Sequence, residues 1–405
     1  MEFRLIVNKS IRIALREGVR SRGRLRRIAY TDLSREHMIH KKYIASAFDV
    51  ALAVLKAYRR RCRQGKIGSP PFMKRPMLKA DYQSFWLDRE TGRLRLPIVG
   101  TEGVQFRLPL SEWHRSFLGD PSWTLACVTV VPGKILLVVR REGPKLYEPT
   151  SLIALDTNED SLDGVAVNME GARLLTLPLG GLRQVQAIHF RRRRRFARKK
   201  AHDRRIRRNL LTREGRRERN RIRQRIHRVS KRLVNAATAS RSAIILERLS
   251  LHGAGGYSRR MNRRLSSWPR GEIHRQIGYK AALAGVPVIK VNPAWTSKTC
   301  PVCGARRRDR VGKVFVCLAC DWEMDRQINA GMNILKSALA SNEALARAVR
   351  FQPGALRDDV VIPLYDLFRE GAGAREEPSG VESGSFEFIR RNPTRISRPA
   401  SAPPP

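Results

Sequence analysis

The sequence predicts a chain of mixed class, in which a mainly β N-terminal part precedes an α/β part that a small metal-binding ribbon interrupts. Three observations support this prediction. Short strand-like segments fill residues 81–141, the buried strand Leu152–Leu155 runs directly into an acidic residue, and two CxxC knuckles lie between Cys300 and Cys320. Short alternating segments are typical of β-structure, and paired CxxC knuckles are typical of zinc ribbons.

The charge of the chain points to a polyanionic partner. Its 405 residues include 81 Lys plus Arg against 36 Asp plus Glu, which gives a formal net charge of +45 at pH 7. Such an excess favours nucleic acid, and a hydrophobic content of 42% is high enough for folded cores. We predict no transmembrane span and no secretory signal, and the cysteine usage fits a reducing compartment.

The N-terminal residues are predicted to form a small β-barrel that carries a helical insertion. The apolar patch Phe3–Val7 fits one strand. Apolar residues at three- and four-residue steps predict a helix at about 34–64, with Ser34 as its N-cap. Two hairpins follow, the second about Pro132-Gly133, and several short strands close together favour a barrel.

Two buried strands of the second part end in carboxylates. Leu152–Leu155 leads into Asp156, and a turn and two further strands follow it. A carboxylate at the end of a buried strand, followed at once by a hairpin, is how a ribonuclease H-like fold presents its first metal ligand. A lone aspartate at a strand end is more often a turn cap. The later strand Ile244–Leu246 ends at Glu247, so the sequence offers two carboxylates in equivalent positions.

Residues 191–232 are predicted to form two long helices with one buried face and one strongly basic face. The segment has 22 Arg or Lys against three acids, while Ile222, Ile226 and Val229 keep an apolar stripe. An ordinary solvated face would mix the two signs of charge, so this one favours contacts with a phosphate backbone. The residues expected to bind nucleic acid are Arg191, Arg192, Arg193, Arg194, Arg195, Arg198, Arg221 and Arg225.

Four cysteines, Cys300, Cys303, Cys317 and Cys320, are predicted to hold one structural zinc ion. Two CxxC knuckles separated by 13 residues bring four thiolates into the tetrahedron that structural zinc prefers. Two disulfides or unbound thiols are the plain alternative. A catalytic zinc is not expected, because the cysteines would fill all four positions. A predicted helix follows the ribbon, with Asp325 near its N-terminus.

In this order the segments resemble the TnpB family of transposon-encoded RNA-guided nucleases, which is related to the type V CRISPR effectors. The resemblance extends over about 34–336 and rests on IASAFDVALAVLKAYRRR, LIALDTNED, IILERLS, NRRLSSW, YKA…GVPVIKVNP, TSKTCPVCG and CxxC…DR…NAGMNI. It implies an N-terminal barrel with a helical insertion at about 34–64, and then a ribonuclease H-like (RuvC) domain with an inserted zinc ribbon. The expected domain limits are 1–145 for the barrel, 150–297 and 322–340 for the RuvC-like domain, 298–321 for the ribbon, and 341–405 for a largely flexible extension.

The resemblance also implies the partners and the place of action. A guide RNA reads a double-stranded DNA target by base pairing while the protein grips the backbone. We therefore expect a guide RNA and double-stranded DNA as partners, no membrane, and association with the nucleoid in the cytoplasm of a prokaryotic cell. The oligomeric state is left open.

The family's cleavage centre has three carboxylates that hold two magnesium ions. Asp156 matches the first carboxylate and Glu247 the second, whereas the third normally lies on the second aspartate of the motif D-R-D-x-N-A. This chain has D-R-Q-I-N-A, so Gln327 occupies that position. Glutamine supplies a neutral oxygen but no negative charge. On a helix Asp325 would point to a different face from Gln327, whereas on extended backbone the two would share a face.

Two functions follow from the incomplete motif. The first is RNA-guided DNA binding with a disabled nuclease, as in a programmable repressor or a decaying transposon gene. The second is an active magnesium-dependent endonuclease that supports transposon maintenance, with Asp325 or Glu323 as third ligand. We favour the first. A non-specific basic nucleic-acid binder is a third alternative, which bound RNA of one defined length and sequence would exclude.

Overall fold

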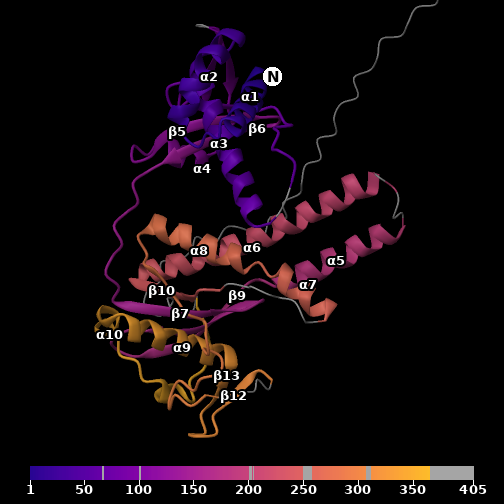
Figure 1. Cartoon of the computed structure of the whole chain (residues 1–405). Coiled ribbons are helices and arrows are strands. Elements are labelled where there is room, and N and C mark those ends of the chain that lie inside the picture. Colours follow the sequence, from indigo (N-terminus) through magenta and orange to yellow (C-terminus); the bar gives the residue numbers. More distant parts are fainter. Residues whose placement is uncertain are drawn as a thin grey trace, which may run out of the picture. The chain divides into compact units, whose positions relative to one another are not determined.

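The computed structural model divides the chain into two compact units, Met1–Gly143 and Pro144–Pro405 (Figure 1). The expected flexibility of the C-terminal extension beyond residue 364 lies outside the described residues, as does the glycine-rich segment 250–257. The structure describes residues 1–65, 68–99, 102–199, 203, 205–249, 258–306 and 312–364.

The N-terminal unit begins with a helix, so the strand predicted at Phe3–Val7 is wrong. Helix α1 spans Glu2–Arg16, because its apolar residues recur at helical spacing and are buried as one stripe. The single helix expected at about 34–64 is also wrong, because two helices cover this stretch: α2 (Arg22–Glu36) and α3 (Lys42–Arg63). Ser34 lies inside α2 and is no N-cap.

The strands of this unit form two antiparallel three-stranded sheets that share one hydrophobic core with the helices. The predicted hairpin about Pro132-Gly133 is confirmed, and Gly133 adopts the positive φ of 75° that its turn requires. Closure of the two sheets into a barrel stays a prediction. One sheet contains β1 (Leu78–Asp81), β5 (Thr124–Val131) and β6 (Lys134–Arg140), the other β2 (Trp86–Leu87), β3 (Arg93–Val99) and β4 (Glu102–Arg107), and α4 (Glu112–Leu118) follows β4.

The second unit is built on one mixed six-stranded sheet in the order β11-β10-β7-β8-β9-β14. The first three strands in sequence, β7, β8 and β9, are antiparallel neighbours, and β10 and β11 then add in parallel beside β7. At the other edge β14, from the C-terminal extension, pairs with β9. The strands span Ser151–Thr157 (β7), Ser161–Val167 (β8), Ala172–Pro178 (β9), Ser242–Glu247 (β10), Val288–Val291 (β11) and Ile362–Pro363 (β14).

Helices cover both faces of this sheet (Figure 1). Ile153 and Leu155 face the core under α6 and α8, whereas Leu152 and Ala154 face α9, because side chains alternate along a strand. The two long basic helices predicted from the sequence are present as α5 and α6. The helices are α5 (Leu182–Lys199), a π-helical turn (Ile206–Leu210), α6 (Leu211–Ala239), α7 (Arg259–Ser267), α8 (Arg270–Ala284), α9 (Arg326–Ser341), α10 (Glu343–Ala348) and a 3-10 turn (Pro353–Leu356).

Two glycines let α9 approach the sheet closely. A Cβ atom on Gly331 of α9 would lie 2.4 Å from the Cα atom of Gly164 on β8, and one on Gly164 would lie 1.9 Å from the carbonyl oxygen of Ala154. No larger residue fits at either position without displacement of the backbone. This contact fixes where α9 begins relative to β7 and β8, and therefore where Asp325 and Gln327 lie.

Candidate functional site

Asp156 and Glu247 lie close together at the C-terminal ends of two neighbouring strands. They lie on the neighbouring parallel strands β7 and β10, whose register pairs Leu155 with Leu246. Strand alternation turns both side chains toward α9. Burial, together with the neighbouring Glu247 carboxylate, raises the pKa of Asp156 to about 8. The neighbouring carboxylates of Asp156 and Glu247 repel each other unless a proton or a cation lies between them.

A further acidic residue beside this pair, Asp163, is buried and was not predicted from the sequence. It lies directly opposite Asp156 on β8 and is only 5% exposed. Its carboxylate accepts hydrogen bonds from Thr176 Oγ1 (2.6 Å), Asn158 Nδ2 (3.0 Å) and Ser161. The available signal is the alternation along residues 161–167, which puts Asp163 on the same face as Val165 and Val167, whereas the sequence predicts a turn up to residue 163.

Asparagines of α9 position the chain beside Glu247. Asn333 Nδ2 donates to the carbonyl oxygens of Thr296 (2.9 Å) and Thr299 (2.7 Å). Thr296 Oγ1 in turn donates to Glu247 Oε1 at 2.8 Å. Asn329, one turn before Asn333, donates to the same Thr299 carbonyl at 3.0 Å. The two asparagines at i and i+4 in the motif NAGMN were the sequence signal for this arrangement.

Asp325 ends β13 and caps α9. Its backbone is extended (φ −53°, ψ 131°), and its carboxylate accepts hydrogen bonds from the backbone N–H groups of Gln327 (2.7 Å) and Ile328 (3.4 Å). Gln327 is already in the first helical turn. Asp325 lies near enough to Asp163 to contribute to the raised pKa of that buried carboxyl, of which burial is the main cause. Glu323, the other residue considered as a third ligand, is exposed on β13.

The four predicted cysteines converge as a group that can hold a metal ion such as zinc. Their sulfur atoms all lie within 4.8 Å of one another, and no second such group of His, Cys, Asp or Glu occurs in the described part of the chain. The Sγ atoms of Cys300 and Cys320 are 3.6 Å apart, and those of Cys303 and Cys317 are 3.5 Å apart. Zn–S bonds of about 2.3 Å place tetrahedral sulfurs about 3.8 Å apart, whereas a disulfide would need about 2 Å.

The strands of the ribbon around these cysteines are short, so a bound metal ion would provide most of its stability. Its strands β12 (Val314–Val316) and β13 (Glu323–Asp325) have three residues each, which is too few for a stable isolated hairpin. Trp322 is buried beside the cysteines, and its indole N–H donates to Asn329 Oδ1 at 3.3 Å. The ribbon therefore connects the metal group directly to the start of α9.

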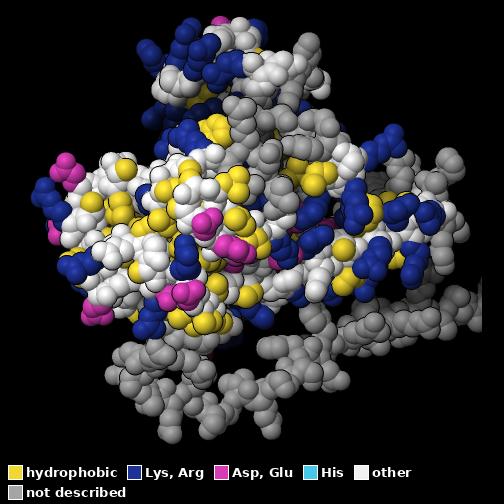
Figure 2. Space-filling model, turned by 90° about the horizontal axis from the view of Figure 1, so that it is seen from below, with side chains coloured by type: hydrophobic (Ala, Val, Ile, Leu, Met, Phe, Trp, Pro, Cys, Tyr) yellow, Lys and Arg dark blue, Asp and Glu magenta, His cyan; other side chains and the backbone are white. Residues whose placement is uncertain are grey.

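The arginines of α5 and α6 divide into two sets. Four of the eight predicted contacts are engaged within the protein: Arg192 with Glu214, Arg193 with Glu218, Arg221 with His189 and Arg225 with the Gly180 carbonyl. The other four line an open hollow of about 400 Å³ at i, i+3, i+4 and i+7 spacing: Arg191, Arg194, Arg195 and Arg198. In Figure 2 one group of Lys and Arg side chains lies toward the right, the side on which α5 and α6 project in Figure 1.

A buried pair holds this helical hairpin together. His189 Nδ1 on α5 lies 2.7 Å from Glu214 Oε1 on α6, and both residues are almost fully buried. Such a pair compensates for the cost of burying each polar group alone. It sets the rotation of α5 and so turns the open arginine set outward.

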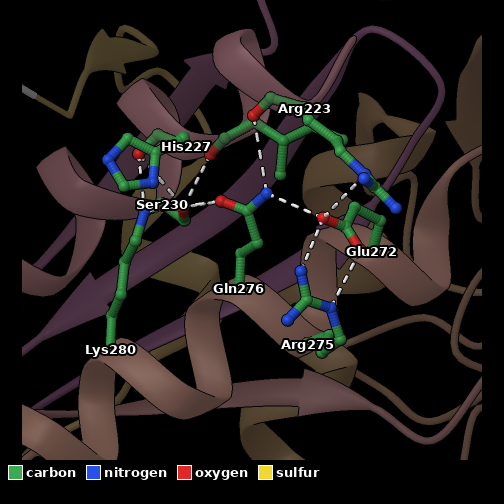
Figure 3. Close-up of polar contacts among 8 residues, drawn as sticks. Arg223, His227, Ser230, Glu272, Arg275, Gln276 and Lys280 are labelled. Carbon is green, nitrogen blue, oxygen red and sulfur yellow. Dashed lines mark hydrogen bonds and ion pairs between the residues drawn. The ribbon is translucent and has the colours of Figure 1, made fainter. Parts of the chain in front are cut away.

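Polar side chains also connect α6 to α8 (Figure 3). Lys280 Nζ donates to the His227 carbonyl and to Ser230 Oγ, both at 2.6 Å, and burial lowers the pKa of Lys280 to about 8. Arg275 donates two hydrogen bonds to Glu272 (2.9 and 2.7 Å), which lower the pKa of that carboxyl to about 2. The Lys280 contacts hold α8 against α6, whereas the Arg275–Glu272 pair joins two residues of α8 itself. The first turns of α8 lie beside the end of β7.

Known proteins share parts of this arrangement. A family described as the Cas12f1-like TNB domain matches residues 271–334, which include α8, β11, the ribbon and the start of α9. TnpB-like protein MJ0751 of Methanocaldococcus jannaschii is 23% identical over 258 residues, which cover 62% of this chain and 92% of the relative. The CRISPR-associated endodeoxyribonuclease Cas12f1 of Sulfoacidibacillus thermotolerans is 39% identical over 75 residues, 18% of each chain.

The fold is also similar to that of a solved structure. A cryo-EM structure of a Cas12f1–sgRNA–target DNA complex contains a chain that matches with a TM-score of 0.59 at 15% identity, over 82% of this chain and 80% of that one. The fold is thus a mixed α/β fold of the Cas12f type. Together with the relatives, it confirms the resemblance to the TnpB family that the motifs predicted. Within the described residues, no helix is long and apolar enough to cross a bilayer.

Proposed function

We propose that this chain is a TnpB-like RNA-guided DNA-binding protein of transposon origin whose nuclease site lacks its third carboxylate, so that cleavage is weak or lost. The observation that carries the proposal is Gln327 at the start of α9, in the place of a charged ligand, while Asp156 and Glu247 meet on the sheet. The known relatives and the net charge of +45 support a guide RNA and double-stranded DNA as partners.

The sheet topology supports a ribonuclease H-like (RuvC) domain. Three antiparallel strands are followed by two parallel ones, and the carboxylates lie on the first and fourth strands. On this proposal 150–297 and 322–340 form the RuvC-like domain around a zinc ribbon at 298–321. The two small sheets within 1–145 correspond to the barrel with its helical insertion. The protein would act on nucleoid DNA in the prokaryotic cytoplasm.

The carboxylate donors of Asp156 and Glu247 fit magnesium, which prefers hard oxygen ligands. Magnesium, when bound, supplies the charge that activates water and stabilises the leaving oxygen. Asp156 and Glu247 would hold it, and a cation there would relieve the repulsion that keeps a proton on this pair. Asp163 would keep its three hydrogen bonds and hold β8 against β7.

The same contacts weigh against Asp325 as a substitute ligand. Its carboxylate already caps α9, and a shift toward the metal would leave the N–H groups of Gln327 and Ile328 without that acceptor. Its proximity to Asp163 is the observation that favours the alternative, an active magnesium-dependent endonuclease with Asp325 or Glu323 as third ligand. Cleavage assays separate the two.

Bound RNA tests the proposed function against a non-specific basic binder. The full chain, expressed with the DNA that flanks its gene, is expected to copurify with RNA of one defined length and sequence. Sequencing of the extracted RNA checks this. A broad mixture of cellular RNA fragments would contradict guided binding and favour the non-specific alternative.

Charge reversal at Arg194 and Arg198 is expected to weaken nucleic-acid binding equally for all sequences, because these side chains can reach phosphates but are too uniform to read bases. Loss of about two phosphate contacts should reduce the slope of log K against log salt by about 2. Arg347→Glu with Arg350→Glu changes two exposed arginines outside α5 and α6, of which Arg347 pairs with Glu343 on α10, and this control should change the binding affinity little. The affinities of both variants are measured over a series of salt concentrations. A variant that prefers a different sequence would contradict the prediction that Arg194 and Arg198 contact phosphates.

A further inference from the structure

A second hollow lies at the edge of the sheet where β7 and β10 end. It has a volume of about 430 Å³, and Leu249, Leu265, Trp268, Arg270 and His274 are among the residues that line it. Leu249 follows Glu247 by two residues. His274 Nε2 lies 2.8 Å from the hydroxyl of Thr157, the residue after Asp156. The hollow thus borders both strand ends that carry the carboxylates, on the α8 side of the sheet.

The aromatic wall of this hollow is held in place. The indole N–H of Trp268 donates to the carbonyl oxygen of Asn158 at 3.1 Å, which ties the ring to the turn after β7. Arg264 on α7 donates to both carboxylate oxygens of Glu159 at 2.8 and 2.7 Å, which ties α7 to the same turn. A ring fixed in this way can stack on a base with little loss of side-chain entropy.

Arg270 differs from the neighbouring arginines in its side-chain contacts. It is partly buried, and burial lowers the pKa of its guanidinium. The nearby Arg264 and Arg275 each pair with a glutamate, but no hydrogen bond or ion pair joins the Arg270 guanidinium to any residue that the structure describes. The Arg270 guanidinium lies over the ring of Trp268, with 5.4 Å between the guanidinium carbon and the ring centroid. A phosphate would supply the missing counter-charge through paired hydrogen bonds.

We propose that this hollow binds one unpaired nucleotide of the DNA strand that passes the carboxylates. The base lies against Trp268 and Leu265, and its phosphate contacts Arg270. The size suits one small ligand, and stacking on an indole accepts any base, as passage of a guided strand requires. This inference rests on the proposed function for the identity of the strand, while the pocket itself rests on the geometry of α7 and α8.

Photo-cross-linking tests the pocket directly. A deoxyuridine hexamer with a central 5-iodouracil is added to the RNA-loaded protein at about 0.3 M salt, which suppresses non-specific phosphate binding. Mass spectrometry of the digested protein is expected to locate the cross-link at Trp268. Arg270→Ala should weaken hexamer binding by about tenfold, and Arg270→Lys should restore part of it. Arg275→Ala, on the same helix but outside the hollow, should stay within about twofold.

Three results would contradict the assignment: hexamer affinities of Arg270→Ala and Arg275→Ala that agree, cross-links only elsewhere, or full competition by inorganic phosphate alone at equal concentration. Zinc content and circular dichroism verify that each variant is folded, and Arg270→Lys keeps the test valid should the alanine variant misfold. Guide-dependent duplex binding is measured in parallel. A wild-type chain that shows no guide-dependent binding of the duplex would refute the proposed function. Hexamer binding that does not depend on Arg270 would refute only the pocket.

Discussion

Replacement of Gln327 by aspartate is expected to increase magnesium-dependent cleavage of guide-matched DNA, by up to roughly a thousandfold, over a wild-type chain that cuts poorly or not at all. Loss of one charged metal ligand typically costs several kcal/mol of transition-state stabilisation, and each 1.36 kcal/mol is about tenfold in rate. Aspartate restores the negative charge where α9 begins, at the position that carries the third carboxylate in the family motif. DNA affinity should change little, because it depends on the basic face and on base pairing.

Gln327→Asn is the matched control, because asparagine has the shape of aspartate without its charge. Cleavage that rises with aspartate and not with asparagine assigns the effect to charge. Efficient cleavage by the unmodified chain, lost on Asp325→Asn, would contradict this account and identify Asp325 as the third ligand. Single-turnover cleavage rates of the guide-loaded proteins separate these outcomes. Absence of cleavage in every variant would refute the restoration and leave guided binding standing.

Removal of zinc is expected to unfold the ribbon and to release the start of α9. Metal analysis should give about one zinc per chain, and Cys303→Ser should lose it. Structural zinc sites contribute on the order of 10 kcal/mol to folding, far more than two three-residue strands can replace. Limited proteolysis should then cut within 312–325 faster than it cuts the zinc-bound chain. Cys62→Ser, which changes an exposed cysteine of the N-terminal unit, should keep its zinc.

The zinc experiment also tests the link between the ribbon and the carboxylates. Asp325 ends β13, and Asn329 and Asn333 fasten residues 296–299 beside Glu247. A zinc-free ribbon should therefore weaken divalent cation binding at Asp156 and Glu247 as well. A metal-free preparation that stays folded and resists proteolysis would contradict the structural role of zinc.

Local patterns predicted much of the second unit. The buried strands that end at Asp156 and Glu247, the CxxC spacing and the apolar stripe of α6 are short-range signals, and the structure contains each of these elements. Asp163 was missed, because only the pairing of β8 with β7 shows that it lies opposite Asp156. The contact of Thr296 with Glu247 joins residues 49 positions apart, and no local pattern reports it.

The first unit shows a different limit. Phe3–Val7 is too short a window to distinguish a strand from a helix, since helical periodicity becomes clear only over eleven or more residues. Ile11 and Ala14 complete the helical stripe of α1. The two sets of arginines on α5 and α6 also required the structure, because His189 and Glu214 lie far apart in sequence and determine which side chains turn outward.

Binding of DNA in magnesium by the guide-loaded wild-type chain tests the central claim most directly. A gel-shift titration compares a duplex that matches the guide with one that carries a mismatched target, and the products are resolved on a denaturing gel. The account predicts tight binding of the matched duplex, weak binding of the mismatched one, and DNA strands that remain largely intact. Equal binding of both duplexes, or rapid cutting of the matched one, would contradict it.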